Sequence, residues 1–276
     1  MAALGSYLDA RSQKGIWSLR IEDLDQARAR PEATSGMLRT LEQHGLLWDQ
    51  EVVIQSKRTT AYQDWLDRLG EQVYGCACSR REIAGLGDLT RYPGACRDGL
   101  PPGRSARALR VRVPAGVIQF EDRIRGTVRE DVQAQVGDFV VRRADGPFSY
   151  QFAVVVDDWD AGVTEVVRGA DLLDSTARQI ALHRLLGLPA PHYAHLPLAV
   201  DASGRKLSKL TRAPALDAGE PGAAVATALR FLGHPPPTEL NGAAPAELLA
   251  WGCAHWDIAR VPRTPQQSVD PAGEAA

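Results

Sequence analysis

The sequence is poor in lysine and cysteine and lacks any long apolar run. Its 32 basic residues include only four lysines, at positions 14, 57, 206 and 209. Four cysteines in a chain of 276 residues are too few for a disulfide framework. No stretch approaches the roughly 18 apolar residues that a membrane span needs, and the first residues do not form a secretory signal. We therefore expect a soluble, cytoplasmic protein without a membrane partner.

The overall charge excludes a globally cationic nucleic-acid-binding protein. The formal net charge is −2 and the isoelectric point is near 6.3. A local basic patch over residues 80–129 holds 11 arginines against five acidic residues. This patch is either a nucleic-acid contact or an ordinary solvated surface.

Stretches with strand and helix patterns alternate along the chain. We expect strands at 15–21, 52–54, 138–142, 163–167 and 196–200, and helices at 2–12, 31–44, 59–70, 171–186, 223–232 and 246–256. In the helix that starts at Pro31, the expected apolar stripe is Met37, Leu38 and Leu41, and Gly45 is placed to end it. The alternation predicts an α/β fold whose parallel sheet binds ligands at the carboxyl ends of its strands.

Three of the four cysteines are close together in the sequence. Cys76, Cys78 and Cys96 fall in a stretch rich in glycine, proline and arginine, which we interpret as an inserted subdomain. Three thiolates suit Zn²⁺, and a tetrahedral structural site needs a fourth ligand. The alternative is that these cysteines are simply buried side chains.

Three loops that follow expected strands carry unusual residues. Lys206 and Lys209 lie in one loop of a chain that otherwise prefers arginine, which favours a requirement for compact ammonium groups near a phosphate. Glu22 lies in a carboxylate-rich turn, and Tyr150 precedes an apolar run that ends in two aspartates. Arg168 precedes a glycine, and arginine suits the bidentate binding of a carboxylate. Each loop taken alone could also be a charged turn or part of the core.

Taken together, these loops resemble the signatures of class I aminoacyl-tRNA synthetases. The stretch Arg205-Lys206-Leu207-Ser208-Lys209 is similar to the KMSKS loop, residues 20–25 are similar to the RIEDTD-like stretch, and residues 150–158 and 166–173 look like the YQLAVVVDD and VVRGADLL blocks of glutamyl and glutaminyl synthetases. The resemblance implies that Lys209 is the catalytic, ATP-binding lysine and that Lys206 assists it. It also implies that Glu22, Tyr150 and Arg168 bind L-glutamate.

The cysteine spacing points to one family among these class I synthetases. A CxC motif, then Tyr92, then Cys96 four residues later resembles the zinc site of glutamyl-Q tRNA(Asp) synthetases, which implies that Cys76, Cys78, Tyr92 and Cys96 bind one structural zinc ion. Enzymes of that family activate glutamate with ATP and Mg²⁺, without tRNA, and attach it to the queuosine of tRNA(Asp). Only 67 residues follow Lys209, which fits a family without a separate anticodon-binding domain, and we expect a monomer.

The resemblance also implies a domain division. We expect a Rossmann-type class I catalytic domain over 1–75 and 136–200, an inserted zinc-binding subdomain on the acceptor side over 76–135, the KMSKS-like loop with a short helical part over 201–260, and a disordered tail over 261–276.

One family motif is missing from the sequence. No HIGH-like segment occurs, and the segment of arginine and serine that helps to hold glutamate is also missing. We expect that Met1 replaces a valine of the family and that the reading frame continues upstream of it. The alternative hypothesis is a catalytically inactive, zinc-stabilised, RNA-binding paralogue.

Overall fold

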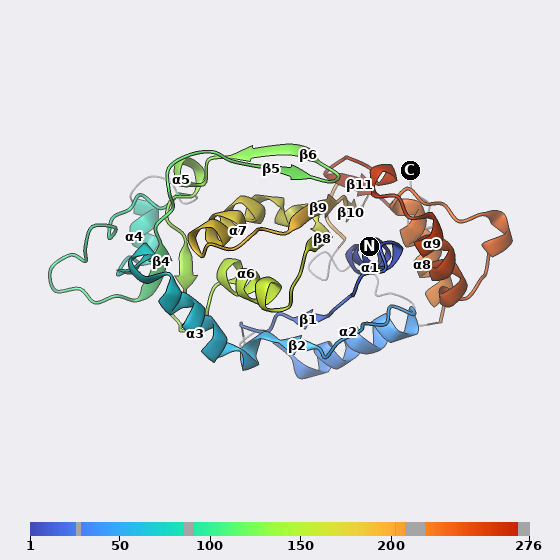
Figure 1. The fold of residues 1–276 in the computed structure, drawn as a ribbon, viewed down its shortest axis with the longest axis horizontal. Coiled ribbons are helices and arrows are strands. Elements are labelled where there is room, and N and C mark those ends of the chain that lie inside the picture. Colours follow the sequence, from blue (N-terminus) through green and yellow to red (C-terminus); the bar gives the residue numbers. More distant parts are fainter. Residues whose placement is uncertain (26–28, 86–90, 202, 208–218, 270–276) are drawn as a thin grey trace.

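The computed structural model describes residues 1–25, 29–85, 91–201, 203–207 and 219–269. Its helices are α1 (Ala2–Ser12), α2 (Pro31–Gln43), α3 (Thr59–Arg68), α4 (Arg80–Gly85), α5 (Val132–Gln135), α6 (Tyr150–Asp160), α7 (Leu173–Leu185), α8 (Pro221–Phe231) and α9 (Pro245–His255). The molecule is elongated: α3 and α4 lie near one end, α8 and α9 form the other, and α6 and α7 lie between them (Figure 1).

The described strands form four small sheets. They are β1 (Arg20–Ile21), β2 (Val53–Ile54), β3 (Val73–Cys76), β4 (Ala108–Val111), β5 (Ile118–Asp122), β6 (Gly126–Glu130), β7 (Val140–Arg142), β8 (Glu165–Gly169), β9 (His192–Leu196), β10 (Leu198–Val200) and β11 (Gln266–Ser268). The strand orders are β1-β2, β10-β11, β3-β4-β7 and β6-β5-β9-β8. The pairs β1–β2, β5–β9, β8–β9 and β10–β11 are parallel.

Most expected elements are present. The expected strands over 52–54, 163–167 and 196–200 pair in parallel, but the expected strand over 138–142 pairs antiparallel to β4, so the expectation of one parallel sheet is wrong for that strand. The expected strand over 15–21 is wrong in its extent, because only its last two residues pair, with β2. Ile16 points away from the core and is 65% exposed. The alternation in this stretch therefore reflects burial of Trp17, not pairing along its whole length.

The expected boundaries of the inserted subdomain do not follow the sheets. The sheet β3-β4-β7 crosses both proposed boundaries, because β3 and β7 flank a strand from inside the segment. The hairpin β5–β6 also lies inside the segment, yet β5 pairs with β9, which pairs with β8. Hydrogen bonding between distant strands therefore makes part of 76–135 continuous with the sheet that carries Arg168.

Two further expectations are corrected. Residues 261–269 are not a disordered tail: β11 pairs with β10, and Val261 is buried. Met37 does not belong to the buried stripe of α2 and is 48% exposed. Leu41 packs against the core as expected, and Gly45 follows α2 with a positive φ of 73°.

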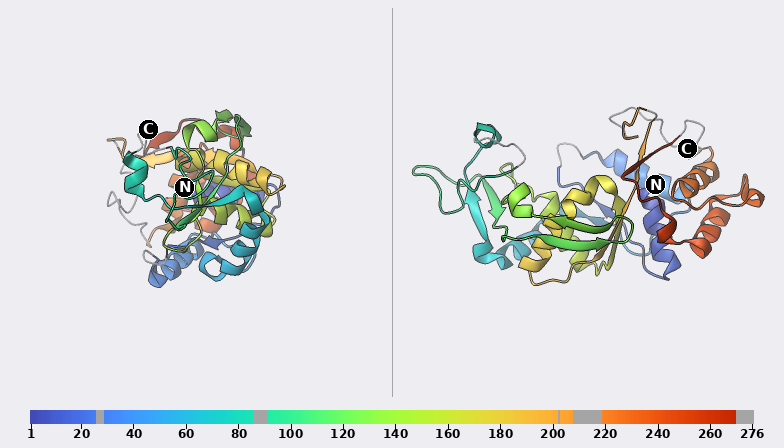
Figure 2. Two further views of the ribbon diagram at one scale, coloured as in Figure 1. Left: turned by 90° about the vertical axis from the view of Figure 1, so that its left-hand side faces the viewer. Right: turned by 90° about the horizontal axis from the view of Figure 1, so that it is seen from above.

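A close contact holds α1 against the sheet. A Cβ on Gly5 would lie 2.6 Å from a methyl carbon of Leu196 in β9, so a larger residue would require the Leu196 side chain to move. On its other side α1 packs against α8 and α9, which Figure 2 shows at the end remote from α4. Of the helices in the described ranges, none has the length and apolar character needed to cross a bilayer.

Candidate active site

A cavity of about 780 Å³ lies between β1, α6 and β8, with the C-terminal part of α1 at its side. Its lining includes Arg20, Glu22, Tyr150, Asp158 and Arg168 among other polar and charged residues. Glu22, Tyr150 and Arg168, which the sequence pattern selects, therefore lie around one space although up to 146 residues separate them.

Arg168 is held by partners on three sides. It lies in β8 and is 9% exposed. Its Nε donates to His195 Nε2 at 3.1 Å, and its Nη2 donates to Thr176 Oγ1 at 2.8 Å and to the Leu172 carbonyl at 3.3 Å. Its Nη1 donates to the Tyr150 hydroxyl at 3.4 Å. The guanidinium thus keeps donor capacity on the side that faces the cavity.

Tyr150 is placed by the start of α6. Ser149 caps this helix, and its hydroxyl accepts from the backbone N–H of Phe152 at 3.4 Å. The tyrosine ring is partly buried at the first helical position, and burial raises the pKa of its hydroxyl above the ordinary value. The hydroxyl therefore stays protonated near neutral pH and can donate a hydrogen bond.

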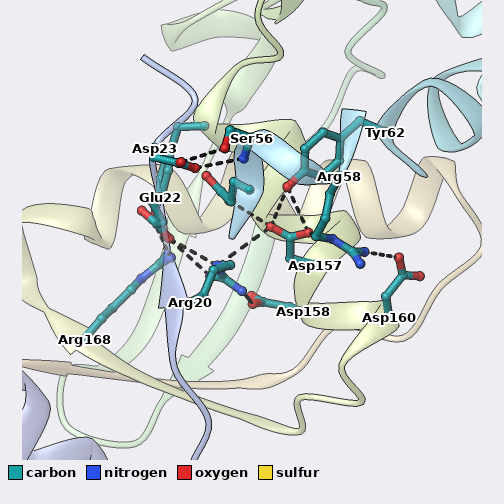
Figure 3. Close-up of polar contacts among 12 residues, drawn as sticks. Arg20, Glu22, Asp23, Ser56, Arg58, Tyr62, Asp157, Asp158, Asp160 and Arg168 are labelled. Atoms are coloured by element: carbon teal, nitrogen blue, oxygen red, sulfur yellow. Dashed lines mark hydrogen bonds and ion pairs between the residues drawn. The ribbon is translucent and has the colours of Figure 1, made fainter. Parts of the chain in front are cut away.

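Glu22 and Arg20 form the opposite wall (Figure 3). Arg20 Nη1 donates to Asp158 Oδ1 at 2.5 Å, and its Nη2 donates to Glu22 Oε1 at 3.2 Å. The Glu22 side chain is 42% exposed, whereas Asp158 is buried. Burial raises the pKa of Asp158 despite the attraction of Arg20.

The turn that carries Glu22 is fixed to the rest of the fold through its neighbour. Asp23 accepts from the backbone N–H of Ser56 at 2.8 Å and from its hydroxyl at 2.7 Å. Asp157 in α6 accepts from Arg58 Nε at 2.6 Å and from the Tyr62 hydroxyl at 2.9 Å. These contacts, drawn in Figure 3, join the ends of β1 and β2 to α6.

The lysine loop is only partly described. Lys209 lies outside the described residues. Lys206 is described, and its ammonium pairs with the Asp171 carboxylate, three residues after Arg168. Asp171 in turn lies against Gly169, where a Cβ would be 2.6 Å from Asp171 Oδ1. Lys206 therefore lies at the carboxyl end of β8, the strand that carries Arg168.

The three clustered cysteines also meet in space. The Sγ atoms of Cys76, Cys78 and Cys96 all lie within 4.8 Å of one another, and the thiols are not in disulfides. The Tyr92 hydroxyl lies 3.4 Å from Cys76 Sγ and 3.9 Å from Cys78 Sγ, and it accepts from the Cys96 N–H at 2.9 Å. The four side chains thus point into one small space in a core of their own.

The cluster has unusual electrostatics. Burial acts to raise the pKa of Cys76, but contacts with Tyr92 and Arg110 outweigh it and lower this pKa. Burial and the neighbouring Cys96 raise the pKa of Cys78 to about 11. Burial also raises the pKa of Tyr92. Cys78 and Tyr92 therefore stay protonated unless a cation binds at the cluster, as expected for metal ligands that lie close together.

Sequence reasoning alone missed several residues that shape the cavity. Arg20 and Asp158 lie within the quoted stretches, but nothing in their spacing indicates that they pair. His195 in β9 and Thr176 in α7 contact Arg168, and Asp122 in β5 contacts His195. The sequence offers one weak signal, the His-Tyr-Ala-His stretch over 192–195, which indicates a loop entering a strand; the structure places it in β9, with His192 exposed and His195 buried.

The cavity combines opposite charges at its walls. The arginine of β8 can bind an anionic group, and an exposed carboxylate after β1 can bind a cationic one. A tyrosine hydroxyl lies beside the arginine. This arrangement suits a small ligand with both a carboxylate and an ammonium group.

Comparison with known sequences gives extensive matches. The model of the family "tRNA synthetases class I (E and Q), catalytic domain" matches residues 1–241. The glutamyl-Q tRNA(Asp) synthetase of Thiobacillus denitrificans is 52% identical over 272 residues, which cover 96% of this chain and 90% of the relative. The protein of the same name from Ectopseudomonas mendocina is 52% identical over 266 residues, with the same coverage of 96% and 90%.

Solved structures show the same fold. A glutamate-tRNA synthetase from Elizabethkingia anophelis matches with a TM-score of 0.82 and 23% identity, covering 99% of this chain and 65% of that chain. A glutamate tRNA ligase from Elizabethkingia meningosepticum, solved in complex with its amino acid, matches with a TM-score of 0.77 and 24% identity, covering 95% and 62%. The chain thus has the α/β fold of a class I synthetase catalytic domain and spans slightly less than two thirds of these solved chains.

Proposed function

Because the chain belongs to the family of class I tRNA synthetases (E and Q), and so to the ligases, we propose that it activates L-glutamate with ATP. The glutamyl group is then transferred to the queuosine of tRNA(Asp). The observation that carries this proposal is the cavity in which Arg168, Tyr150 and Glu22 surround one space.

Each cavity residue has a role in binding the amino acid. Arg168 binds the side-chain carboxylate of glutamate, and the Tyr150 hydroxyl donates to the same end of the ligand. Glu22 receives the ammonium group, for which its exposed carboxylate is suited. Arg20 holds Glu22 and prevents this carboxylate from turning away.

Activation requires little covalent chemistry from the protein. A carboxylate oxygen of glutamate attacks the α-phosphorus of ATP, the bond to the β-phosphate oxygen breaks, and pyrophosphate leaves with its charge. Lys209 meets this developing charge, and Lys206 assists after exchanging its contact with Asp171 for the phosphates. Mg²⁺ enters with ATP as its companion ion.

The cysteine cluster fits one structural zinc ion. Zn–S bonds of about 2.3 Å in a tetrahedron separate two sulfurs by about 3.8 Å and a sulfur from an oxygen ligand by about 3.5 Å. The separation of Cys78 Sγ and Cys96 Sγ is 3.6 Å, and Tyr92 Oη lies 3.4 Å from Cys76 Sγ. Cys76, Cys78, Cys96 and Tyr92 would hold the ion, which stabilises this end of the molecule and takes no part in the reaction.

The acceptor is supported by the relatives and not by the cavity. Two relatives that share half of their residues with this chain are named glutamyl-Q tRNA(Asp) synthetase. Exposed arginines within 80–129 offer positive charge for the tRNA backbone: Arg80, Arg81, Arg91, Arg107 and Arg129. We further propose a monomer that works in the cytoplasm, where ATP, glutamate and tRNA meet.

The test is glutamate-dependent exchange of pyrophosphate into ATP by the purified chain without tRNA. Glutamate should support exchange, whereas glutamine and aspartate should not. Transfer should then occur to tRNA(Asp) that contains queuosine and not to the same tRNA without it. A chain that binds tRNA but catalyses no exchange would instead support the inactive RNA-binding paralogue.

A further inference from the structure

A buried chain of hydrogen bonds lies behind Arg168. Asp122 is the last residue of β5 and is 3% exposed, and His195 in β9 is completely buried. His195 Nδ1 lies 2.6 Å from Asp122 Oδ2, and His195 Nε2 accepts from Arg168 Nε at 3.1 Å. The chain therefore runs from a carboxylate through an imidazole to the guanidinium at the cavity.

The partners determine which imidazole nitrogen carries the proton. A guanidinium can only donate, so His195 Nε2 must be an acceptor without a proton. The ring proton is then on Nδ1 and is donated to Asp122 Oδ2. Thr176 does not disturb this assignment, because its oxygen accepts from Arg168 Nη2 and its proton is free to point to the Leu172 carbonyl or to Nε2.

Asp122 is itself fixed on its other oxygen. Oδ1 accepts from the backbone N–H groups of Ile124 at 3.0 Å, Arg125 at 2.8 Å and His195 at 3.2 Å. Burial acts to raise the pKa of Asp122, but these bonds and the one from the imidazole lower it below the ordinary value. One oxygen thus anchors the β5–β6 turn, and the other is left for the imidazole.

We propose that Asp122 and His195 are positioning residues for glutamate binding. Asp122 keeps the ring proton of His195 on Nδ1, so that His195 Nε2 accepts from Arg168 Nε. With Nε and Nη2 of Arg168 held from behind, the free donor capacity of Nη1 faces the cavity. An arginine that is already oriented loses less side-chain freedom on binding a carboxylate. This inference rests on the proposed function of the cavity.

Asp122→Asn tests the positioning role of Asp122, because the two side chains have almost the same shape. The amide oxygen can replace Oδ1 and keep the three backbone bonds, while the amide nitrogen replaces Oδ2 and donates to His195 Nδ1. The imidazole must then carry its proton on Nε2. Two donors, His195 Nε2–H and Arg168 Nε–H, would face each other, and their hydrogen bond would be lost. We expect the KM for glutamate in pyrophosphate exchange to rise about tenfold, which corresponds to about 1.4 kcal/mol, with the KM for ATP unchanged.

Asp138→Asn is the matched control. Asp138 is 1% exposed, and its carboxylate accepts from the Val113 N–H at 2.8 Å, from the Tyr74 hydroxyl at 2.7 Å and from Arg97 Nη1 at 2.6 Å. It is not among the residues that line the cavity. The same chemical change at this site can lower the melting temperature but should leave the KM for glutamate unchanged.

A second measurement reads the tautomer without activity. In nitrogen-15 NMR spectra, His195 of the full chain should show the proton on Nδ1, and in Asp122→Asn it should show the proton on Nε2. Wild-type protein with the proton on Nε2 would overturn the proposal, as would an active Asp122→Asn protein with an unchanged KM for glutamate. A wild-type chain without glutamate-dependent exchange would overturn the proposed function and this role with it, whatever the tautomer.

Discussion

Two regions of the molecule each bring a few polar side chains together, but they do so in different ways. The cysteine cluster (Cys76, Cys78, Tyr92 and Cys96) comes from 21 consecutive residues. The arginine pocket (Arg20, Glu22, Tyr150, Asp158 and Arg168) is assembled from β1, α6 and β8. The first depends on a local loop conformation, and the second depends on how distant elements pack.

The two regions also differ in how their charges are balanced. In the arginine pocket, Arg20 pairs with Asp158, and Arg168 has fixed hydrogen-bond acceptors. In the cysteine cluster, the closest partners of the thiols are one another and one hydroxyl. The comparison teaches that the pocket can be ordered by the protein alone, whereas the proposed zinc ion would complete the cluster.

The largest effect is expected from removing one thiolate. Cys78→Ser should reduce bound zinc from one ion per chain to none, because three ligands hold Zn²⁺ much more weakly than four. Residues 76–107 should become more accessible to protease, while the sheet β6-β5-β9-β8 stays folded. Metal analysis of protein purified without added zinc measures the loss, and Cys253→Ser, a half-buried cysteine in α9, should keep the metal.

Tyr92→Phe sharpens the same prediction. It removes only the phenol oxygen, so zinc affinity should fall if that oxygen is the fourth ligand. A phenylalanine variant with full zinc affinity would assign the fourth position to another donor. Wild-type protein free of metal, with an ordered loop over 91–107, would remove the zinc site altogether.

The next largest effect is expected on the rate of glutamate activation, and not on zinc or glutamate binding. Lys209→Ala should lower the rate of glutamate activation about 100-fold or more, since a contact made mainly in the transition state is worth about 3 kcal/mol. Glutamate affinity and zinc content should stay the same. Pyrophosphate exchange measures the rate, and Lys57→Ala at an exposed lysine is the control. Unchanged exchange in Lys209→Ala would refute the synthetase role of this loop.

Arg168→Ala tests the arginine pocket itself. Loss of a charged hydrogen-bond donor to a carboxylate costs about 1.5–3 kcal/mol, so the KM for glutamate should rise about 10-fold to 100-fold. Zinc content should not change, which separates the two regions. Arg178→Ala removes a half-buried arginine of α7 that donates to the Asp174 carbonyl and is not among the residues that line the cavity, and it should leave the KM unchanged. Equal KM values for both variants would exclude Arg168 from the glutamate site.

Mild acid should weaken the helix behind the arginine pocket. Burial lowers the pKa of His183 in α7 to about 4, and its Nδ1 has no partner. His183 in the unfolded chain binds a proton near pH 6.5, whereas in the folded state it stays neutral down to about pH 4. The free energy of unfolding is therefore not reduced by His183 above pH 6.5, and it decreases as the pH falls from 6.5 toward 4.

Between pH 7 and pH 5 the free energy of unfolding should fall by about 2 kcal/mol more in the wild type than in His183→Leu. Denaturant unfolding at the two pH values measures this difference. His255→Gln, at an exposed histidine of α9, should follow the wild type. A His183→Leu protein with the wild-type pH dependence would show that His183 is not neutral and buried in solution.

The sequence predicted the cysteine cluster and much of the element order because both depend on local patterns. The CxC spacing and Cys96 are visible in the chain, and α1, α3, α8 and α9 follow their apolar periodicity. Gly45 was identified because a positive φ after a helix favours glycine. These features need no knowledge of distant partners.

The parts that the sequence could not provide depend on tertiary contacts. Nothing local indicates that β5 joins β9 or that β11 pairs with β10, which is why the segment boundaries and the tail were misassigned. The hydrogen-bond partners of Arg168 come from 18 residues before it to 27 after it, and no spacing rule connects Asp122 to His195. Met37 shows the limit of periodicity, since an apolar residue on a surface helix can face solvent.

The most direct test of the account is a calorimetric titration of the purified chain with L-glutamate, and with L-glutamine for comparison. The arginine pocket predicts one glutamate bound per chain and at least about tenfold weaker binding of glutamine, because an amide forms no charge-assisted pair with Arg168. Saturable glutamate binding that is lost in Arg168→Ala is the predicted result. Equal affinity for the two amino acids, or no binding of glutamate, would contradict the account.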